Sequence, residues 1–90
     1  MTASQAAGQA TVKLYASLMA YLPAGAKDQS VQVPLDQDAT IVAMLAAMRV
    51  PREKCHLVLV NGVFVPPGAR ETQRLNDGDT LAVWPPVAGG

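Results

Sequence analysis

The sequence has little of several residue types, and each scarcity excludes a class of protein or site. It contains one cysteine, Cys55, and one histidine, His56. An internal disulfide is therefore impossible, nothing indicates secretion, and His56 alone forms neither a metal site of its own nor a catalytic triad. No apolar stretch approaches the roughly 18 residues of a membrane span. Residues 1–10 carry neither a basic cluster nor a hydrophobic run, so they are not a signal peptide and we expect a cytoplasmic protein.

Charge of one sign is also missing. Seven acidic residues balance seven basic ones, and no run of like charge occurs. Nucleic-acid-binding proteins usually present a clustered basic face, so nucleic acid is not an expected partner. The chain also lacks a glycine-rich phosphate loop, paired carboxylates and a Ser/His/Asp set. We therefore expect no bound cofactor, no metal and no active site within the chain itself.

Hydrophobic residues, by contrast, make up half of the 90 residues, and charged residues only 16%. This balance predicts one globular domain. The small, polar residues 1–10 are expected to be disordered. Alternating apolar positions predict a strand from Thr11 to Tyr15 and a second strand over 31–36, which Pro34 places at a sheet edge. Between them, the spacing of Leu18, Tyr21 and Leu22 indicates a short helix before Pro23.

One longer helix is expected in the middle of the chain. Asp38 and Thr40 supply the side-chain acceptors typical of a helix start. The apolar stripe follows at helical spacing, formed by Ile41, Met44, Leu45 and Met48. Because the intervening residues are mostly alanine and valine, we expect much of this helix to be buried. Pro51 forces Val50 out of helical geometry and should end it.

The second half of the chain reads as three strands. The apolar run 57–60 predicts a central strand covered on both faces. Asn61-Gly62 is a strong signal for a tight hairpin turn, and 63–65 is the return strand. A polar loop from Gly68 to Arg74 leads to a turn over 76–79, and the last strand is Thr80 to Trp84. The chain is therefore expected to form an α+β domain over residues 11–84, with a mixed sheet of about five strands packed on one main helix.

After Trp84 come two prolines and, at the end of the sequence, two glycines. Pro85 and Pro86 favour an extended path, and from Pro86 to Gly90 the chain spans at most about 16 Å. Gly89 and Gly90 lack a Cβ and fit a slot too narrow for other residues. Residues 85–90 are therefore expected to be a flexible tail that offers the α-carboxylate of Gly90 to another enzyme.

This ending resembles the ending of the MoaD/ThiS sulfur carriers, and most of all the small subunit of molybdopterin synthase. The resemblance rests on a Gly-Asp turn, an apolar strand ending in an aromatic residue, and a Pro-Pro-Val-small-Gly-Gly tail. These are Asn76-Asp77-Gly78-Asp79, Leu81-Ala82-Val83-Trp84 and Pro85-Pro86-Val87-Ala88-Gly89-Gly90. The order of elements from Thr11 onward matches as well. The resemblance implies the β-grasp, or ubiquitin-like, arrangement, with the first strand beside the last.

The resemblance also implies a function. A ubiquitin-activator-like adenylating enzyme would consume ATP to convert the Gly90 carboxylate into an acyl-adenylate, and a sulfur donor would leave a thiocarboxylate there. The tail would then enter the large subunit of molybdopterin synthase and donate sulfur to the pterin precursor in molybdenum cofactor biosynthesis. Gly90 and Gly89 are thus the expected reacting end. The expected partner contacts are Pro85, Pro86, Val87, Ala88, Trp84 and Phe64.

Other functions stay open. Related carriers serve thiamine thiazole, tRNA thiolation, cysteine or siderophore synthesis, and the proline-rich stretch 65–70 departs from typical molybdopterin synthase small subunits. In a different class, the chain is a ubiquitin-like protein modifier or binding module. Stable conjugates to lysine residues would distinguish a modifier from a sulfur carrier.

Single residues have competing interpretations. Cys55 is either a thiol in sulfur relay or a small core residue, and the core is favoured. Trp84 either anchors a partner or covers the core. Phe64 either belongs to an apolar docking face or lies in the core with Val65, and again the core is favoured. The guanidinium groups of Arg49, Arg52 and Arg70 are expected to be solvated.

Overall fold

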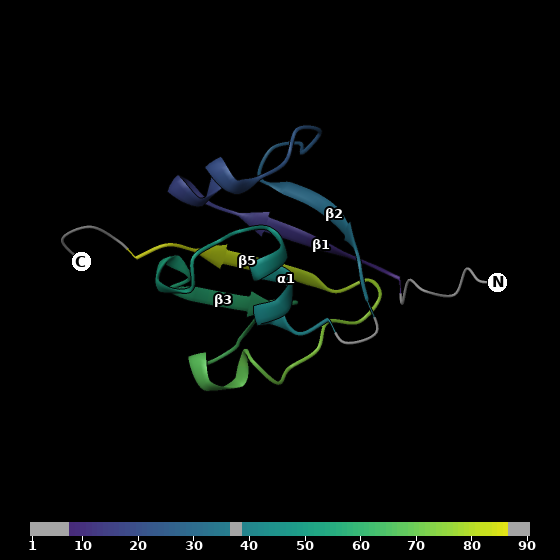
Figure 1. Cartoon of the computed structure of the whole chain (residues 1–90), viewed down its shortest axis with the longest axis vertical. Coiled ribbons are helices and arrows are strands. Elements are labelled where there is room, and N and C mark those ends of the chain that lie inside the picture. Colours follow the sequence, from purple (N-terminus) through teal and green to yellow (C-terminus); the bar gives the residue numbers. More distant parts are fainter. Residues whose placement is uncertain (1–7, 37–38, 87–90) are drawn as a thin grey trace.

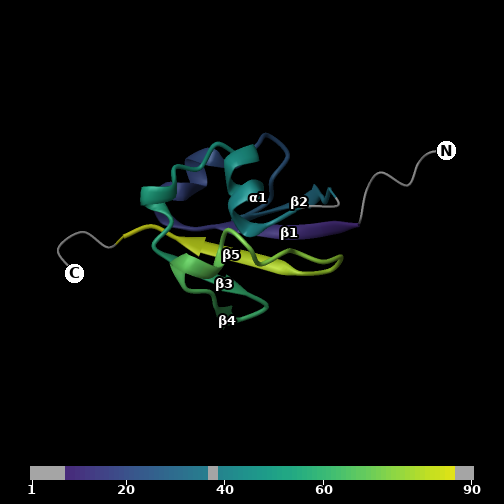
Figure 2. The same cartoon turned by 60° about the horizontal axis from the view of Figure 1, so that its bottom comes forward.

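A five-stranded mixed sheet carries one α-helix on one of its faces (Figures 1 and 2). The computed structural model describes residues 8–36 and 39–86. The strands are β1 (Gln9–Leu14), β2 (Ser30–Pro34), β3 (Leu57–Val60), β4 (Val63–Phe64) and β5 (Thr80–Trp84), and the helix is α1 (Ile41–Ala47). Their order in the sheet is β2-β1-β5-β3-β4. This is the β-grasp arrangement, and the expected fold class is confirmed.

The first and last strands pair at the centre of the sheet. β1 and β5 run parallel, with Val12 opposite Leu81 and Leu14 opposite Val83. All four side chains are fully buried. Alternation along each strand turns these residues toward α1 and their neighbours toward the other face. The pairing therefore places the end of β5 in the middle of the sheet and not at its rim.

β1 begins two residues before the expected domain boundary at Thr11. Gln9 and Ala10 pair with Pro34 and Val33 of β2, and Ala10 is 1% exposed. The backbone N–H of Gln9 also donates to Asp77 Oδ1 at 2.9 Å. The prediction that residues 1–10 are disordered was therefore wrong for residues 9 and 10. An alanine is compatible with burial or exposure, so the sequence did not predict that Ala10 is buried. Its burial follows from the pairing of β1 with β2.

Helix α1 begins where its cap was predicted. Thr40 is the N-cap residue, and its Oγ1 accepts a hydrogen bond from the backbone N–H of Ala43 at 3.1 Å. Asp38, the other expected cap, lies outside the described residues. The apolar stripe faces the core, with Ile41, Met44 and Leu45 buried. The helix ends before Arg49, which has the left-handed φ of 64°.

Much of α1 was expected to be buried, and this was wrong. Ala43, Ala46 and Ala47 are exposed, and Val42 is half-buried. One sheet face lies beneath the helix (Figure 2), and the described segments beside it leave these three alanines exposed. Small apolar residues are compatible with either environment, so their lack of polarity did not establish burial.

The hairpin of β3 and β4 turns at Asn61 and Gly62, as predicted. Both residues have positive φ, 52° and 83°, which the tight turn requires. Coverage of β3 differs from the prediction, however. Val58 and Val60 are buried, but Leu57 and Leu59 are only half-buried, because no described element covers the second face of the sheet. An apolar run of four residues here reflects one buried face and one partly exposed face.

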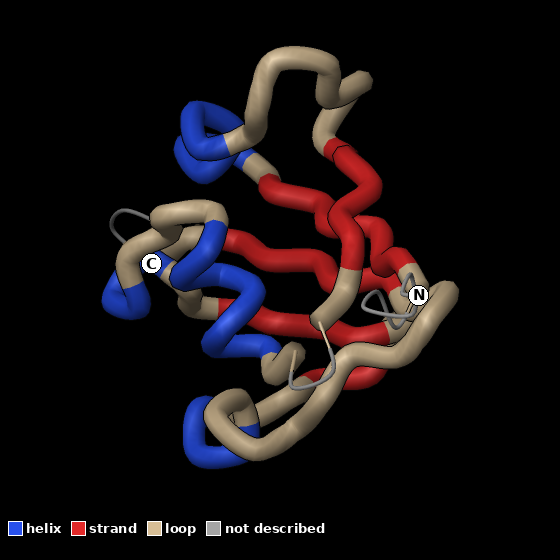
Figure 3. The backbone as a smooth tube through the Cα atoms, turned by 45° about the vertical axis from the view of Figure 1, so that its right-hand side comes forward, coloured by secondary structure: helices blue, strands red, loops and turns tan. Residues whose placement is uncertain are grey.

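Short 3-10 helices and loops complete the fold. They are η2 (Ala16–Tyr21), which contains the predicted short helix residue Leu18, η3 (Arg52–Lys54) and η4 (Pro67–Ala69). From η4 the chain returns to β5 as a long loop (tan in Figure 3). β2 lies at the sheet edge, as Pro34 predicted. Within the described ranges, no helix is both long enough and apolar enough to cross a bilayer.

Candidate functional site

The end of β5, from which the C-terminal tail begins, is held from both sides. The backbone N–H of His56 donates to the carbonyl of Trp84 at 2.9 Å, and the N–H of Tyr15 donates to the carbonyl of Val83 at 3.2 Å. Pro85 has no N–H with which to continue the ladder. It is half-buried, and the following Pro86 is exposed. The chain therefore changes from a fully paired central strand to an exposed segment within two residues.

The indole of Trp84 lies flat against the phenol ring of Tyr15. Their centroids are 4.3 Å apart and the ring planes differ by 1°. Both side chains are half-buried, on the sheet face opposite α1. An aromatic pair of this kind contributes about 0.5–1.5 kcal/mol beyond the area that it buries. The stacked rings therefore hold the end of β5 against the end of β1, and part of their aromatic surface stays exposed.

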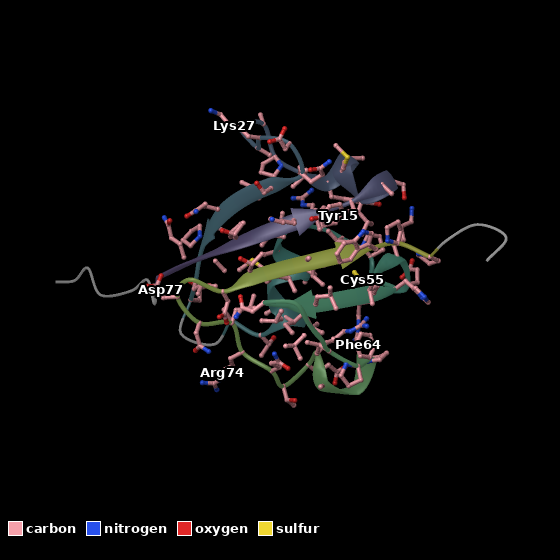
Figure 4. The ribbon with its side chains drawn as sticks, turned by 180° about the vertical axis from the view of Figure 1, so that it is seen from behind. Tyr15, Lys27, Cys55, Phe64, Arg74 and Asp77 are labelled. Carbon is pink, nitrogen blue, oxygen red and sulfur yellow. The ribbon has the colours of Figure 1, made fainter. Side chains whose placement is uncertain are left out.

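Apolar side chains continue from this pair across the outer sheet face. The register places Leu57 beside Trp84, and Leu59 between Ala82 and Phe64. Phe64 is 52% exposed, so its expected place in the core was wrong, whereas Val65 is 2% exposed and does belong to the core. We call this surface the outer-face patch, and it consists of Tyr15, Leu57, Leu59, Phe64 and Trp84. Figure 4, which views the sheet from behind, shows Tyr15 and Phe64 on this side.

Cys55 lies in the hydrophobic core, as the favoured interpretation predicted. Its thiol donates to the carbonyl of Pro51 at 3.4 Å. Burial raises the pKa of Cys55, and the nearby Arg70 guanidinium offsets only part of that effect. The thiol is consequently protonated at neutral pH and is a poor nucleophile, so these features do not support a sulfur relay through Cys55.

Arg70 is buried, which corrects the expectation that its guanidinium is solvated. The residue is 7% exposed. Its Nε donates to the carbonyl of Val65 at 3.0 Å, and its two terminal nitrogens donate to the carbonyls of Cys55 and His56 at 2.8 and 3.2 Å. Burial lowers the pKa of this guanidinium. Arg70 thus joins the loop after β4 to the segment that begins β3, next to the end of β5. Arg49 and Arg52 are exposed, as predicted.

A cavity of about 440 Å³ lies beside this arginine, between α1, η3 and η4. Val42, Leu45 and Val50 line its apolar side, and Arg52 and His56 lie on its polar side. His56 also bonds to Trp84, so the cavity adjoins the end of β5. Among the residues that the structure describes, no group of three or more His, Cys, Asp or Glu side chains could hold a metal ion.

The predicted site residues thus divide into two groups. Trp84, Pro85 and Pro86 are brought together at the end of β5, and Phe64 lies on the same sheet face as Trp84. Val87, Ala88, Gly89 and Gly90 lie outside the described residues. Tyr15 was not among the predicted site residues. Its position one residue after β1 gave a signal only once β1 was known to pair with β5.

The family model described as Mut7-C ubiquitin matches residues 7–89. A comparison with curated proteins finds no match.

Three solved structures illustrate the structural likeness. The HVO 2177 protein of Haloferax volcanii is 25% identical, with a TM-score of 0.71 over 92% of this chain and 87% of that one. SAMP1 from the same organism is 29% identical, with a TM-score of 0.61 over 92% and 100%. A putative molybdopterin converting factor subunit 1 from Pyrococcus furiosus is 20% identical, with a TM-score of 0.61 over 89% and 99%, and shows a shared fold.

Proposed function

Since the chain belongs to the Mut7-C ubiquitin family, we propose that it is a ubiquitin-like sulfur carrier whose C-terminal glycine is activated by a partner enzyme. The observation that carries this proposal is the way in which β5 ends. A central strand, paired on both sides, ends in a stacked aromatic and two prolines, the second of which is exposed. Such an end is suited to presenting the residues that follow it to another protein.

The reaction itself takes place at the carboxylate of Gly90 in a mature chain that ends at that residue. A carboxylate is a poor electrophile because an oxide or hydroxide would have to leave. Attack of its oxygen on the α-phosphorus of ATP releases pyrophosphate and forms an acyl-adenylate. A sulfur donor then attacks the carbonyl carbon, AMP departs with the electrons of the broken C–O bond, and a thiocarboxylate results. The partner supplies the catalytic groups, and this chain is a co-substrate.

The last four residues carry the partner contacts that this reaction needs. Gly89 and Gly90 have no side chain beyond the backbone and would fit a narrow channel leading to the nucleotide. Val87 and Ala88 would contact the wall of that channel. Pro85 and Pro86 reduce the entropy that the tail loses on entering it. The body would meanwhile dock through the outer-face patch, in which Phe64 and Trp84 are the aromatic anchors.

The proposed pathway is molybdopterin synthesis, with the large subunit of molybdopterin synthase as acceptor and the cytoplasm as location. The Pro-Pro-Val-Ala-Gly-Gly ending at residues 85–90 favours it. The likeness to the Pyrococcus furiosus protein concerns the fold and does not choose between this pathway and other sulfur-transfer pathways. No cofactor is required in the carrier, because ATP is consumed on the activating enzyme.

A second candidate is a ubiquitin-like protein modifier. SAMP1 of Haloferax volcanii, whose name in another solved structure is small archaeal modifier protein 1, is 28–29% identical to this chain. In this case a lysine amine in place of sulfur would attack the activated Gly90 carbonyl, and an isopeptide bond would form. Both candidates share the activation step and differ only in the nucleophile that follows it.

Intact mass spectrometry distinguishes the two. The chain would be incubated with a cognate activating enzyme, ATP and sulfide, and then with a mixture of candidate acceptor proteins. A gain of about 16 Da, the difference between sulfur and oxygen, supports the sulfur carrier. Lysine conjugates that resist thiol reagents support the modifier. Formation of either product supports activation of Gly90, and absence of both products would contradict it.

Replacing the terminal glycine tests the same site by mutation. Gly90→Val places a branched side chain at the reacting end, and we expect it to abolish the 16 Da gain while the circular dichroism spectrum stays unchanged. Gly68→Val is the matched control, because a Cβ at Gly68 meets nothing within 4 Å. It should be thiocarboxylated as well as the wild type. Normal thiocarboxylation of Gly90→Val would contradict the proposed role of the tail.

A further inference from the structure

The outer edge of β2 offers backbone groups that the sheet does not use. The N–H of Leu14 bonds to the carbonyl of Gln29, and the N–H of Leu35 bonds to the carbonyl of Gly8. In an antiparallel pair of strands, hydrogen-bonded and non-bonded residue pairs alternate. Counting from Gln29 and Leu35, the bonded residues of β2 are Val31 and Val33, whose backbone groups point toward β1. Gln32 and Pro34 consequently turn theirs away from the sheet. The open edge therefore presents one N–H and two carbonyls.

This edge is short for identifiable reasons. Proline has no N–H, so Pro34 contributes only its carbonyl. At the other end, the N–H and carbonyl of Ser30 both bond to Lys27. Proteins commonly shorten sheet edges in this way to prevent uncontrolled pairing with other strands. What is left around Gln32 is long enough for a few residues of an extended peptide.

Two cavities lie along the same edge, between β2 and α1. One of about 400 Å³ is lined by Tyr21, Val31 and Met48, and one of about 300 Å³ by Ala39, Ala43 and Met44. Val33, Pro34 and Ala47 line both cavities. Two of the exposed alanines of α1, Ala43 and Ala47, line these cavities, and their short side chains leave the space beside the edge open. We call these two cavities and the edge between them the β2 groove.

Charges of opposite sign lie at the two ends of the groove. Arg49 lines the cavity beside Val31, where β2 begins, and Asp36 lines the cavity beyond Pro34, where β2 ends. Both side chains are exposed. Arg49 has no ion pair within the described part of the chain. A bound segment would therefore be favoured if it carried an acidic residue at the Arg49 end and a basic residue at the Asp36 end.

We propose that the β2 groove binds a short extended segment of a partner protein, which runs antiparallel to β2. The antiparallel direction lets one peptide residue bond to both the N–H and the carbonyl of Gln32. Two apolar side chains, two residues apart and about 7 Å from each other, then enter the two cavities. The basic residue of the segment stands two positions before the first apolar residue and the acidic residue two positions after the second. Alternation then turns both charged side chains to the groove side, the acidic one toward Arg49.

This site is independent of the proposed carrier function. No residue of the outer-face patch lines either cavity. A carrier with a blocked β2 groove should still be thiocarboxylated, and a chain with an inactive tail should still bind the segment. The two proposals can therefore fail separately.

The test is a titration of the ¹⁵N-labelled full chain with a synthetic peptide, acetyl-Lys-Thr-Val-Thr-Val-Thr-Glu-amide, followed by NMR. We expect saturable shifts centred on the amides of Gln32 and Val33 and on the last turn of α1, with a Kd below about 1 mM. A peptide in which both valines are replaced by serine should cause no saturable shift. Absence of shifts with the valine peptide at about 2 mM would overturn the proposal.

Two adjacent alanines of α1 provide a matched pair of variants. Ala47→Glu places a charge at the wall that the two cavities share, and should weaken peptide binding by at least about tenfold. Ala46→Glu adds the same charge to the same helix, but Ala46 lines the cavity on the other side. It should bind within about twofold of the wild type. Equal weakening by both variants would show that the groove is not the binding site.

Reversal of the Arg49 charge tests the predicted direction of the peptide. Arg49→Glu should weaken binding of the valine peptide by about threefold to tenfold at low ionic strength. A peptide with lysine in place of its glutamate should show the opposite preference and bind this variant more tightly than the wild type. If the two peptides do not exchange their preferences, the antiparallel orientation is wrong.

Discussion

Arg70 connects three segments of backbone through a single side chain. Its guanidinium bonds to the carbonyls of Val65, Cys55 and His56, all within 3.2 Å. A buried cation costs free energy unless its donors are satisfied, and here carbonyl dipoles satisfy at least three of the five. The backbone N–H of His56 also donates to the carbonyl of Trp84, so the Arg70 hydrogen bonds help to hold the end of β5 in place. In the proposed carrier, these hydrogen bonds would act by holding the end of β5, and with it Pro85, in position.

Removal of the Arg70 guanidinium should be costly. Arg70→Met keeps most of the aliphatic volume but leaves three buried or half-buried carbonyls without a donor, and we expect a loss of about 2–4 kcal/mol in the free energy of unfolding. Urea denaturation followed by circular dichroism measures it. Arg49→Met, at an exposed arginine, should change stability by less than about 0.5 kcal/mol. Similar effects of the two substitutions would contradict the structural role of Arg70.

The Cys55 thiol predicts a dependence of stability on pH. Burial raises its pKa in the folded state, so above the ordinary thiol pKa of about 8.5 the unfolded chain releases a proton that the folded chain retains. Stability from this group is complete below that pH and declines as pH rises toward the folded pKa. Wild type should therefore lose more stability between pH 8 and pH 10 than Cys55→Ala does. Parallel stability curves for the two proteins would show that Cys55 is not perturbed.

At the scale of elements, the β3–β4 hairpin has two different apolar surfaces. Val60 and Val63 lie opposite each other in the register, as do Leu59 and Phe64, and successive residues alternate between faces. Val63 is 67% exposed at the edge of the face that carries α1, and Phe64 is 52% exposed on the outer face. Of these two exposed residues, only Phe64 belongs to the outer-face patch, on the same sheet face as Trp84.

This difference predicts unequal effects on activation of the carrier. Phe64→Ala should raise the KM of the activating enzyme for this chain by about tenfold with little change in kcat, because docking is weakened but the tail is intact. Val63→Ala, on the opposite face of the same strand, should leave KM within about twofold. Steady-state release of pyrophosphate measures both. Docking through the outer-face patch is wrong if Val63→Ala has the larger effect.

At the scale of the whole molecule, the first and last strands in the sequence are neighbours in the middle of the sheet. β1 and β5 pair in parallel, and β5 pairs on its other side with β3. These central strands contain the fully buried residues Val12, Leu14, Val58, Leu81 and Val83. The strand on which the tail is mounted is thus part of the core and not an appendage to it.

Hydrogen exchange should show this difference in local stability. Amides within β1 and β5 should exchange only through global unfolding, and therefore most slowly. The hairpin amides that join β3 to β4 should exchange at least about tenfold faster, because two-residue β4 is an edge strand with both side chains exposed. If the amides of β5 exchanged as fast as those of β4, the strand that precedes residues 85–90 would not be a rigid part of the core.

The sequence predicted the features that depend on a few neighbouring residues. Alternation, the Thr40 cap and the Asn61-Gly62 turn are local signals, and each gave the correct element. The errors concern which element covers which residue. The apolarity of residues 57–60 and of the α1 alanines was read as burial on all sides, and the charge of Arg70 was read as exposure. In each case a partner distant in sequence decided the outcome.

What the sequence alone determined is therefore the order of its elements and the α+β class, because propensity and turn geometry are properties of single residues or close neighbours. The tertiary structure decided that Gln9 and Ala10 join the sheet, that Tyr15 stacks on Trp84, and that Phe64 is left on an open face. Burial depends on which elements pack against each other, and these contacts involve residues that lie up to about seventy positions apart in the sequence.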